Sequence, residues 1–216
     1  MSQTHEESIT CPNCGQAVSF TAYDTLNRAF DPEAADKLMN GNFFEVRCPH
    51  CGTVSNPLYP MLYHDPENIT LIWYSYDREF LTNSAAVLDE LRAQVPAVAE
   101  LAAGYRLRIV DDPLVLSEKA LIFKHELDDR LIEIYKLRVE KSLREQYPET
   151  VIDRILFDAD ANTFLCFTAA GRLNQSFDPG VYNALDDEFP SLPDGIEIDR
   201  EWAGKIVTSD QGPGTR

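Results

Sequence analysis

Long hydrophobic runs are missing from this 216-residue sequence, and positive charge is scarce. No stretch approaches the roughly 20 apolar residues that a membrane-spanning helix needs, so we expect no membrane partner. The chain has 19 Lys and Arg residues against 36 Asp and Glu residues, which gives a formal net charge of −17. Because binding to a phosphate backbone requires clustered positive charge, we also expect no DNA or RNA partner.

Two further absences bound the class of protein. The first eight residues are polar and acidic and contain no apolar segment of the kind that a secretory signal peptide needs, so we expect a cytoplasmic protein. The chain contains no internal repeat and no low-complexity block. The apolar fraction of 44% is typical of globular proteins, and the length allows one core plus a small second module.

Cysteine is infrequent, but four of the five cysteines form two matching motifs. The motifs are Cys11-Pro12-Asn13-Cys14-Gly15 and Cys48-Pro49-His50-Cys51-Gly52. Two Cys-x-x-Cys pairs supply four thiolates, which form the tetrahedral shell that Zn²⁺ prefers. We therefore predict one zinc ion, bound by Cys11, Cys14, Cys48 and Cys51. Since a closed shell leaves no open position for water or substrate, we expect this zinc to be structural.

Other functions of these four thiols agree less well with the sequence. Disulfides are typical of secreted chains, and the thioredoxin-like redox motif is single rather than doubled. A thiol-based redox sensor, which would lose its zinc when the thiolates oxidise, stays an alternative for the same four cysteines. The fifth cysteine, Cys166, lies in an apolar segment with no basic neighbour in the sequence, so we expect it to be buried and unreactive.

The residues around the two motifs resemble the CpXC domain family, which is named after its paired Cys-Pro-x-Cys motifs. The similarity continues in Asp31-Pro32-Glu33 and in the segment Tyr59-Pro60-Met61-Leu62-Tyr63-His64-Asp65. It covers about residues 9–135. The resemblance implies a bacterial or archaeal zinc-binding domain, and it implies no particular catalytic activity.

Local patterns predict an α+β fold, in which a zinc-ribbon-like element with two Cys-Pro-x-Cys-Gly knuckles packs on a small mixed or antiparallel sheet with helices. Strands are predicted over residues 17–23, 43–47, 69–76 and 105–110. A short helix should begin at Asp31, with Pro32 at its first position, and end at Gly41. Residues 84–103 predict two short helices broken by Pro96.

A longer helix and a hairpin are expected beyond this domain. Ser117 to Tyr147 predicts one amphipathic helix with a polar second half, and residues 151–168 predict a β-hairpin. We therefore divide the chain into a zinc domain (9–135), the end of the bridging helix (136–148), a C-terminal accessory region (149–208) and disordered tails (1–8 and 209–216). The apolar stripe of Val139, Leu143 and Tyr147 would also suit contact with a second copy.

Two sets of residues suggest catalysis. His64 and Asp65 resemble a catalytic dyad, although a turn before Pro66 explains them as well. An acidic set on the long helix suggests a nuclease-like metal site, although surface ion pairs explain it better. That set comprises Glu126, Asp128, Asp129 and Glu133, with Lys136 beside them. We therefore assign no catalytic residue and expect a protein-binding or adaptor module. An enzyme with a non-zinc active site, a hydrolase or a nuclease, is the alternative.

Overall fold

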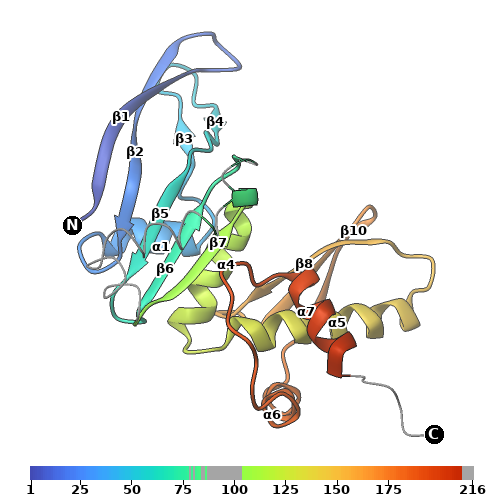
Figure 1. Ribbon diagram of the computed structural model, residues 1–216. Helices are drawn as coiled ribbons and strands as arrows, with labels where there is room; N and C mark the ends of the chain where they lie inside the picture. Colours follow the sequence, from blue (N-terminus) through green and yellow to red (C-terminus); the bar gives the residue numbers. More distant parts are fainter. Residues whose placement is uncertain (78, 80, 84–85, 87–103, 211–216) are drawn as a thin grey trace, which may run out of the picture. The chain divides into compact units, whose positions relative to one another are not determined.

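The computed structural model describes residues 1–77, 79, 81–83, 86 and 104–210 (Figure 1). The chain divides into two compact units, Met1–Ser117 and Glu118–Arg216, which are described separately below. Nearly all of the helix pair expected over residues 84–103 lies outside the described residues, as do residues 211–216 of the expected C-terminal tail. No helix in the described part of the chain has the length and hydropathy needed to cross a membrane.

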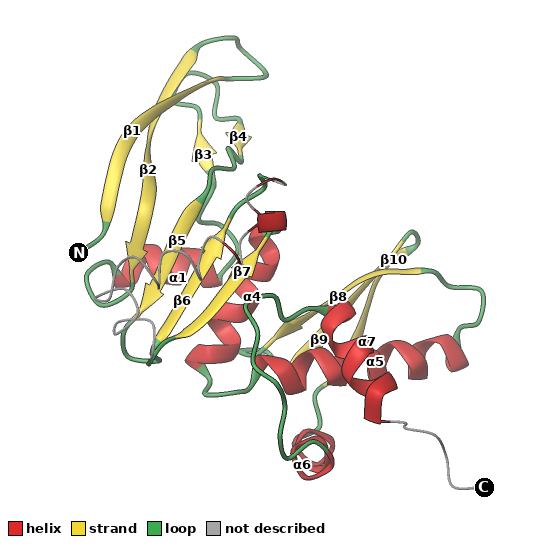
Figure 2. Cartoon of the chain, viewed as in Figure 1, coloured by secondary structure: helices red, strands yellow, loops and turns green. Residues whose placement is uncertain are grey.

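A five-stranded mixed sheet forms the N-terminal unit, with the strand order β1-β2-β5-β6-β7 (Figure 2). The strands are β1 (Gln3–Thr10), β2 (Ala17–Asn27), β5 (Met61–Asp65), β6 (Thr70–Tyr74) and β7 (Arg106–Val110). The pairs β1–β2 and β5–β6 are antiparallel, whereas β2–β5 and β6–β7 are parallel. A separate two-stranded ribbon, β3 (Val46–Arg47) with β4 (Val54–Ser55), projects the second cysteine motif. The α+β class is therefore confirmed.

In the inner strands β5 and β6, buried and half-buried positions alternate because successive side chains point to opposite faces of the sheet. In β6, Thr70, Ile72 and Tyr74 are buried, as the β-branched and aromatic composition predicted. The neighbouring strand β7 lies where a strand was predicted, and it contains a buried charged residue. Arg108 is only 1% exposed and donates through Nη1 to the carbonyl of Leu107.

The expected disorder of residues 1–8 is wrong, because β1 begins at Gln3 and pairs with β2 as far as Thr10. Nearly every side chain of β1 is exposed, so backbone hydrogen bonds to β2 hold the strand rather than burial. His5 adds contacts across the pair, with Nδ1 3.1 Å from Asp24 Oδ2. A strand with no buried face carries no apolar pattern, which is why the sequence did not predict it.

The helix between the two cysteine motifs is α1 (Pro32–Met39), and it starts and stops where the sequence predicted. Asp31 occupies the position before the helix, although its side chain makes no capping hydrogen bond there. Gly41 follows with a φ of +75°, a conformation that favours glycine. The apolar edge of α1 is buried through Ala35, Leu38 and Met39.

The single helix predicted from Ser117 to Tyr147 is wrong, because two helices occupy this stretch. They are α4 (Pro113–Lys124) and α5 (Asp129–Gln146). Between them Glu126 has a φ of +56°, and the Asp128 side chain accepts a hydrogen bond from the N–H of Arg130. An αL residue ends one helix, and an Asp cap begins the next, so the chain changes direction here.

A three-stranded antiparallel sheet of order β10-β9-β8 packs on α5 in the C-terminal unit. The predicted hairpin is confirmed as β8 (Ile152–Asp158) and β9 (Thr163–Thr168). A third strand, β10 (Gly171–Ser176), and the helices α6 (Pro179–Glu188) and α7 (Arg200–Asp210) were not predicted. Aromatic rings fill the core, with the ring centroid of Phe164 4.7 Å from that of Tyr135 and 4.8 Å from that of Phe157.

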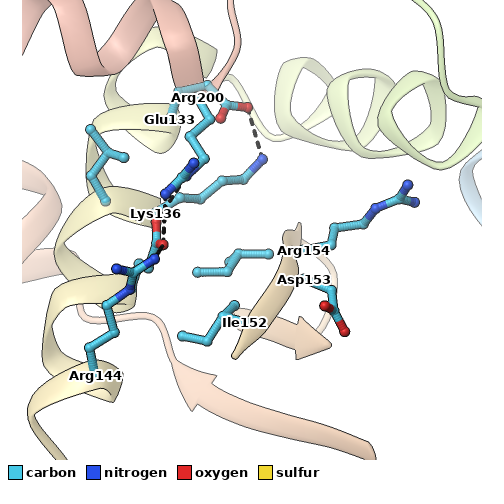
Figure 3. Close-up of a pocket in the computed structure, with 10 residues that line it drawn as sticks. Glu133, Lys136, Arg144, Ile152, Asp153, Arg154 and Arg200 are labelled. Carbon is cyan, nitrogen blue, oxygen red and sulfur yellow. Dashed lines mark hydrogen bonds and ion pairs between the residues drawn. The ribbon is translucent and has the colours of Figure 1, made fainter. Parts of the chain in front are cut away.

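The α5 stripe was expected to pack either on the tail hairpin or on a second copy, and it is mostly buried within the C-terminal unit, which contains that hairpin. Val139 and Leu143 are buried, and only Tyr147, at 48% exposure, remains on the surface. Val139 and Leu143 therefore belong to the core of the C-terminal unit. Charged side chains are buried on α5 as well, among them Lys136, whose amine lies beside the Glu133 carboxylate (Figure 3).

Candidate metal centre

The two cysteine motifs fold into the same local structure. In the first, the N–H of Cys11 donates to the carbonyl of Gln16 (2.9 Å), and the N–H of Gly15 donates to the carbonyl of Cys11 (2.9 Å). In the second, the N–H of Cys48 donates to the carbonyl of Thr53 (2.8 Å), and the N–H of Gly52 donates to that of Cys48 (2.9 Å). The two knuckles are therefore equivalent, residue for residue.

Glycine is required at the last position of each motif. Gly15 has a φ of +72° and Gly52 a φ of +77°, in the left-handed region that other residues rarely adopt. The tight turn lets both cysteines of a pair direct their sulfurs to one side. The doubled Cys-x-x-Cys-Gly pattern thus encodes the backbone geometry as well as the donor atoms.

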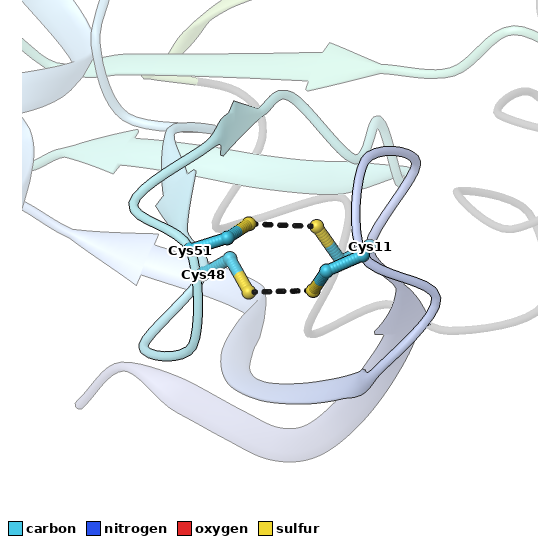
Figure 4. Close-up of side chains that lie close together, drawn as sticks. Cys11, Cys48 and Cys51 are labelled. Carbon is cyan, nitrogen blue, oxygen red and sulfur yellow. Dashed lines mark hydrogen bonds between the residues drawn. The ribbon is translucent and has the colours of Figure 1, made fainter.

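The four sulfurs converge between the knuckles (Figure 4). Cys11 Sγ lies 3.6 Å from Cys51 Sγ, and Cys14 Sγ lies 3.7 Å from Cys48 Sγ. All four lie within 4.8 Å of one another, and none is in a disulfide. A tetrahedral site with metal–sulfur bonds of about 2.3 Å has sulfur–sulfur edges of about 3.8 Å. The cluster can therefore hold a metal ion.

Proton equilibria in the cluster also fit a metal site. Hydrogen bonds from the side chain and the backbone of Thr53 lower the pKa of Cys51 to about 5. The pKa of Cys14 is raised to about 12, because burial and the neighbouring sulfurs outweigh the hydrogen bond from the Gln16 backbone. Four thiolates do not coexist here without a cation, so a metal that replaces the remaining protons suits this donor set.

The cluster has one buried side and one open side. Cys11 and Cys48 are buried and share a small core with Val18, against which Ile9 and Val46 pack. Cys51 is exposed, as is His50 inside the second motif. The sulfurs thus join the turn between β1 and β2 to the ribbon of β3 and β4.

His64 and Asp65 do not form a dyad. They are the last residues of β5, and Asp65 Oδ1 accepts from the N–H groups of Glu67 and Asn68 in the turn that follows. Adjacent residues of a strand point to opposite faces. Asn27 Nδ2 donates to His64 Nδ1 (2.9 Å), and His64 Nε2 lies 3.0 Å from the hydroxyl of Tyr105. The carboxylate of Asp65 instead accepts from Arg28 Nη1 at 2.9 Å.

The acidic set expected on the long helix forms ion pairs, and those of Asp129 and Glu133 are buried rather than at the surface. Asp129 accepts from Lys119 Nζ (2.8 Å), which also lies 3.9 Å from Glu133, and Glu133 accepts from Lys136 Nζ (2.8 Å). Asp128 caps α5, and Glu126 lies in the turn before it. These pairs neutralise one another, so the geometry of a carboxylate metal site is not formed.

Two parts of the metal centre were not apparent from the sequence. Thr53 lies beside Cys51, with Oγ1 3.3 Å from Sγ, and the cores of the knuckles meet through Val18 and Val46. The fifth cysteine, Cys166, is fully buried as expected, and burial raises the pKa of its thiol to about 11. A small polar residue two positions after a cysteine is a weak signal, so the role of Thr53 required the structure.

Comparison with known proteins agrees with this geometry. The sequence profile described as CpXC protein matches residues 9–136, which is more than half of the chain. The chain belongs to the CpXC family. The match includes both cysteine motifs and ends within α5. No curated protein and no solved structure is significantly similar to the chain.

Proposed function

We propose that this CpXC protein binds one structural zinc ion through Cys11, Cys14, Cys48 and Cys51. The convergence of four sulfurs from two equivalent knuckles carries the proposal. Sulfur donors in a tetrahedral arrangement are typical of zinc, and a four-thiolate shell has no free coordination position. The zinc then links two segments that are distant in the sequence, and its binding energy contributes to folding.

The protein's role is proposed to be that of a binding or adaptor module in the cytoplasm. A hollow of about 280 Å³ in the N-terminal unit is lined by the aromatic side chains of Phe20, Phe43, Phe44 and Tyr59. Phe20, Phe43 and Tyr59 are half-buried, so their rings are accessible at the surface. Aromatic residues of this kind are enriched in the contact surfaces of protein complexes.

The same hollow is connected to the metal centre. Val46 lines it and also packs against the core formed by Cys11, Val18 and Cys48. Zinc would hold Val46 and the adjacent Phe43–Phe44 segment in place through Cys48. The metal would thereby support a protein-binding surface without taking part in a reaction. The acidic charge of −17 supports a partner other than nucleic acid.

The proposed domain organisation follows the extent of the family match, whereas the compact units divide at Ser117 and Glu118. The proposal is a zinc domain of residues 9–135, a segment of residues 136–148 that includes the end of α5, and an accessory region of residues 149–208. The oligomeric state stays a prediction, which sizing chromatography would test.

Metal analysis and partner capture test the proposal together. Purified protein should contain one zinc per chain, and Cys48→Ser should lower that content. Tagged wild-type protein and a Phe43→Ser, Tyr59→Ser variant would then be used to capture partners in native cells. Phe30→Ser is the matched control, because Phe30 is 64% exposed and does not line the hollow. A partner retained by the control and lost by the double variant supports the module. Identical captures for all three proteins would contradict it.

A redox-sensing role is a second candidate, and the exposure of Cys51 supports it. An oxidant can reach an exposed sulfur more easily than one that is buried. Under this alternative, mild peroxide would release zinc with formation of disulfides, and a thiol reductant would restore binding. Zinc that stays bound under these conditions would exclude this alternative without affecting the structural role.

A further inference from the structure

A cavity of about 160 Å³ lies in the C-terminal unit, bordered by α5, by the start of β8 and by Arg200 of α7 (Figure 3). An engineered protein cavity of roughly 150 Å³ accommodates benzene. The space therefore admits a compact molecule of about that size. Nothing in the zinc-binding role involves this part of the chain.

The lining combines apolar and charged side chains. Leu137 of α5 and Ile152 and Ile155 of β8 form its apolar part. The charged part comprises the cations Lys136, Arg144, Arg154 and Arg200 and the carboxylates Glu133, Glu140 and Asp153. Arg144 and Arg200 share a single carboxylate, that of Glu140, which leaves a surplus of one positive charge at this pair in a chain whose net charge is −17. One bound monoanion would balance that surplus.

Two of the arginines are held in place by a single buried carboxylate. Glu140 accepts from Arg144 Nη2 (2.6 Å) and from Arg200 Nη2 and Nε (2.7 and 2.9 Å). A guanidinium group has five N–H donors, so Arg144 and Arg200 each have N–H groups beyond those that Glu140 binds. Their side chains are 62% and 68% exposed, and in Figure 3 they converge from two helices, whereas Arg154 extends away.

Of the other two cations of the lining, Lys136 is already neutralised by buried carboxylates. Lys136 Nζ donates to Glu133 (2.8 Å) and to Glu118 (2.8 Å), and its side chain is only 9% exposed. Lys136 therefore closes the inner wall, and the anion-binding capacity rests on Arg144 and Arg200. Guanidinium groups fixed in this way favour carboxylates, because the planar donors match the two carboxylate oxygens.

We propose that this cavity binds a small monoanionic carboxylate with a compact apolar body. The carboxylate contacts Arg144 and Arg200, and the apolar body lies against Leu137, Ile152 and Ile155. This ligand class satisfies the charge surplus, the volume and the apolar part of the lining together. A phosphate ion satisfies only the charge surplus. A neutral apolar molecule satisfies only the volume and the apolar lining.

Calorimetric titration of the full chain with benzoate tests the ligand class. Benzoate should bind saturably with one site per chain. Benzamide has the same shape without the charge, and acetate has the charge without the ring, so each should bind at least about tenfold more weakly. Absence of saturable benzoate binding would overturn the proposal, and so would benzamide or acetate binding as tightly as benzoate.

Variants locate the site. Arg200→Gln should weaken benzoate binding at least about tenfold, since it removes one guanidinium group. Lys205→Gln is the matched control, because it removes the same charge from the same helix and Lys205 does not line the cavity. Arg144→Gln, on α5, provides an independent second variant. Equal weakening by Arg200→Gln and Lys205→Gln would indicate long-range attraction only and would refute the site, as would unchanged binding in both arginine variants.

Discussion

The two units of this CpXC protein reach stability by different means. In the N-terminal unit, a small core of Cys11, Val18 and Cys48 joins β2 to the β3–β4 ribbon, and the sulfurs of that core form the candidate metal centre. The C-terminal unit has an aromatic core around Phe164 and buried ion pairs such as Lys119–Asp129. A metal can therefore supplement apolar burial at the knuckles of the N-terminal unit, whose sheet and α1 have a core of their own, whereas the C-terminal unit depends on packing and on matched charges alone.

Removal of the metal should produce the largest difference in stability between the two units. Chelation, or Cys48→Ser, should unfold residues 9–60 and spare the β8–β9 hairpin, because metal binding contributes on the order of 10 kcal/mol to folding in small zinc modules. Hydrogen exchange followed by mass spectrometry would report each region separately. Cys166→Ser is the control, since Cys166 lies outside the cluster. Equal protection of residues 9–60 with and without metal would contradict this difference between the units.

Leu131→Asp should destabilise the C-terminal unit by about 4 kcal/mol or more, because Leu131 is buried on α5 and the new carboxylate would have no partner. Leu143 is buried on the same helix, so Leu143→Asp should also be costly, whereas the exposed Tyr147 should tolerate Tyr147→Asp. Urea denaturation measures the three variants. Wild-type stability in Leu131→Asp would refute the packing of α5.

Breaking the buried pair Lys119–Asp129 should cost somewhat less stability than Leu131→Asp. Lys119→Met removes one partner and leaves the buried Asp129 carboxylate without its counter-ion Lys119, which costs about 3–5 kcal/mol. The double variant Lys119→Met, Asp129→Leu should recover most of that loss, because both charges of the pair are removed together. Thermal or urea denaturation of both variants decides the point. A double variant as unstable as the single one would show that the charges themselves are needed.

The smallest expected effect is a pH dependence in the N-terminal unit. Burial, followed by repulsion from the N-terminal ammonium group, lowers the pKa of His64 below 6.5. The folded state therefore favours neutral His64, so its contribution to stability is present above pH 6.5 and is lost as the pH falls towards the lowered value. The donor Asn27 Nδ2 would then face a protonated nitrogen. Urea denaturation between pH 7.5 and 5 measures this loss, and His64→Gln should reduce its slope. If the stability of that variant changes with pH as much as that of the wild type, another group causes the pH dependence.

Patterns over short stretches predicted several elements correctly. The doubled Cys-x-x-Cys-Gly motif encodes two equivalent knuckles, and Asp31-Pro32 with Gly41 delimits α1. The β8–β9 hairpin follows from two apolar segments around a polar turn. Each of these signals depends on backbone preferences within a few residues, so it can be read without knowledge of the rest of the fold.

Tertiary structure decided the features that depend on distant partners. β1 exists because β2 offers a backbone ladder, and Arg108 is buried because the sheet encloses it. The break between α4 and α5 depends on a left-handed residue at Glu126 and a cap at Asp128, where an apolar periodicity of 3.6 residues continues across both helices. The sequence by itself thus determined the donor atoms and the local turns of the metal centre. Long-range pairing and burial determined which charged side chains became internal ion pairs and which remained at the surface.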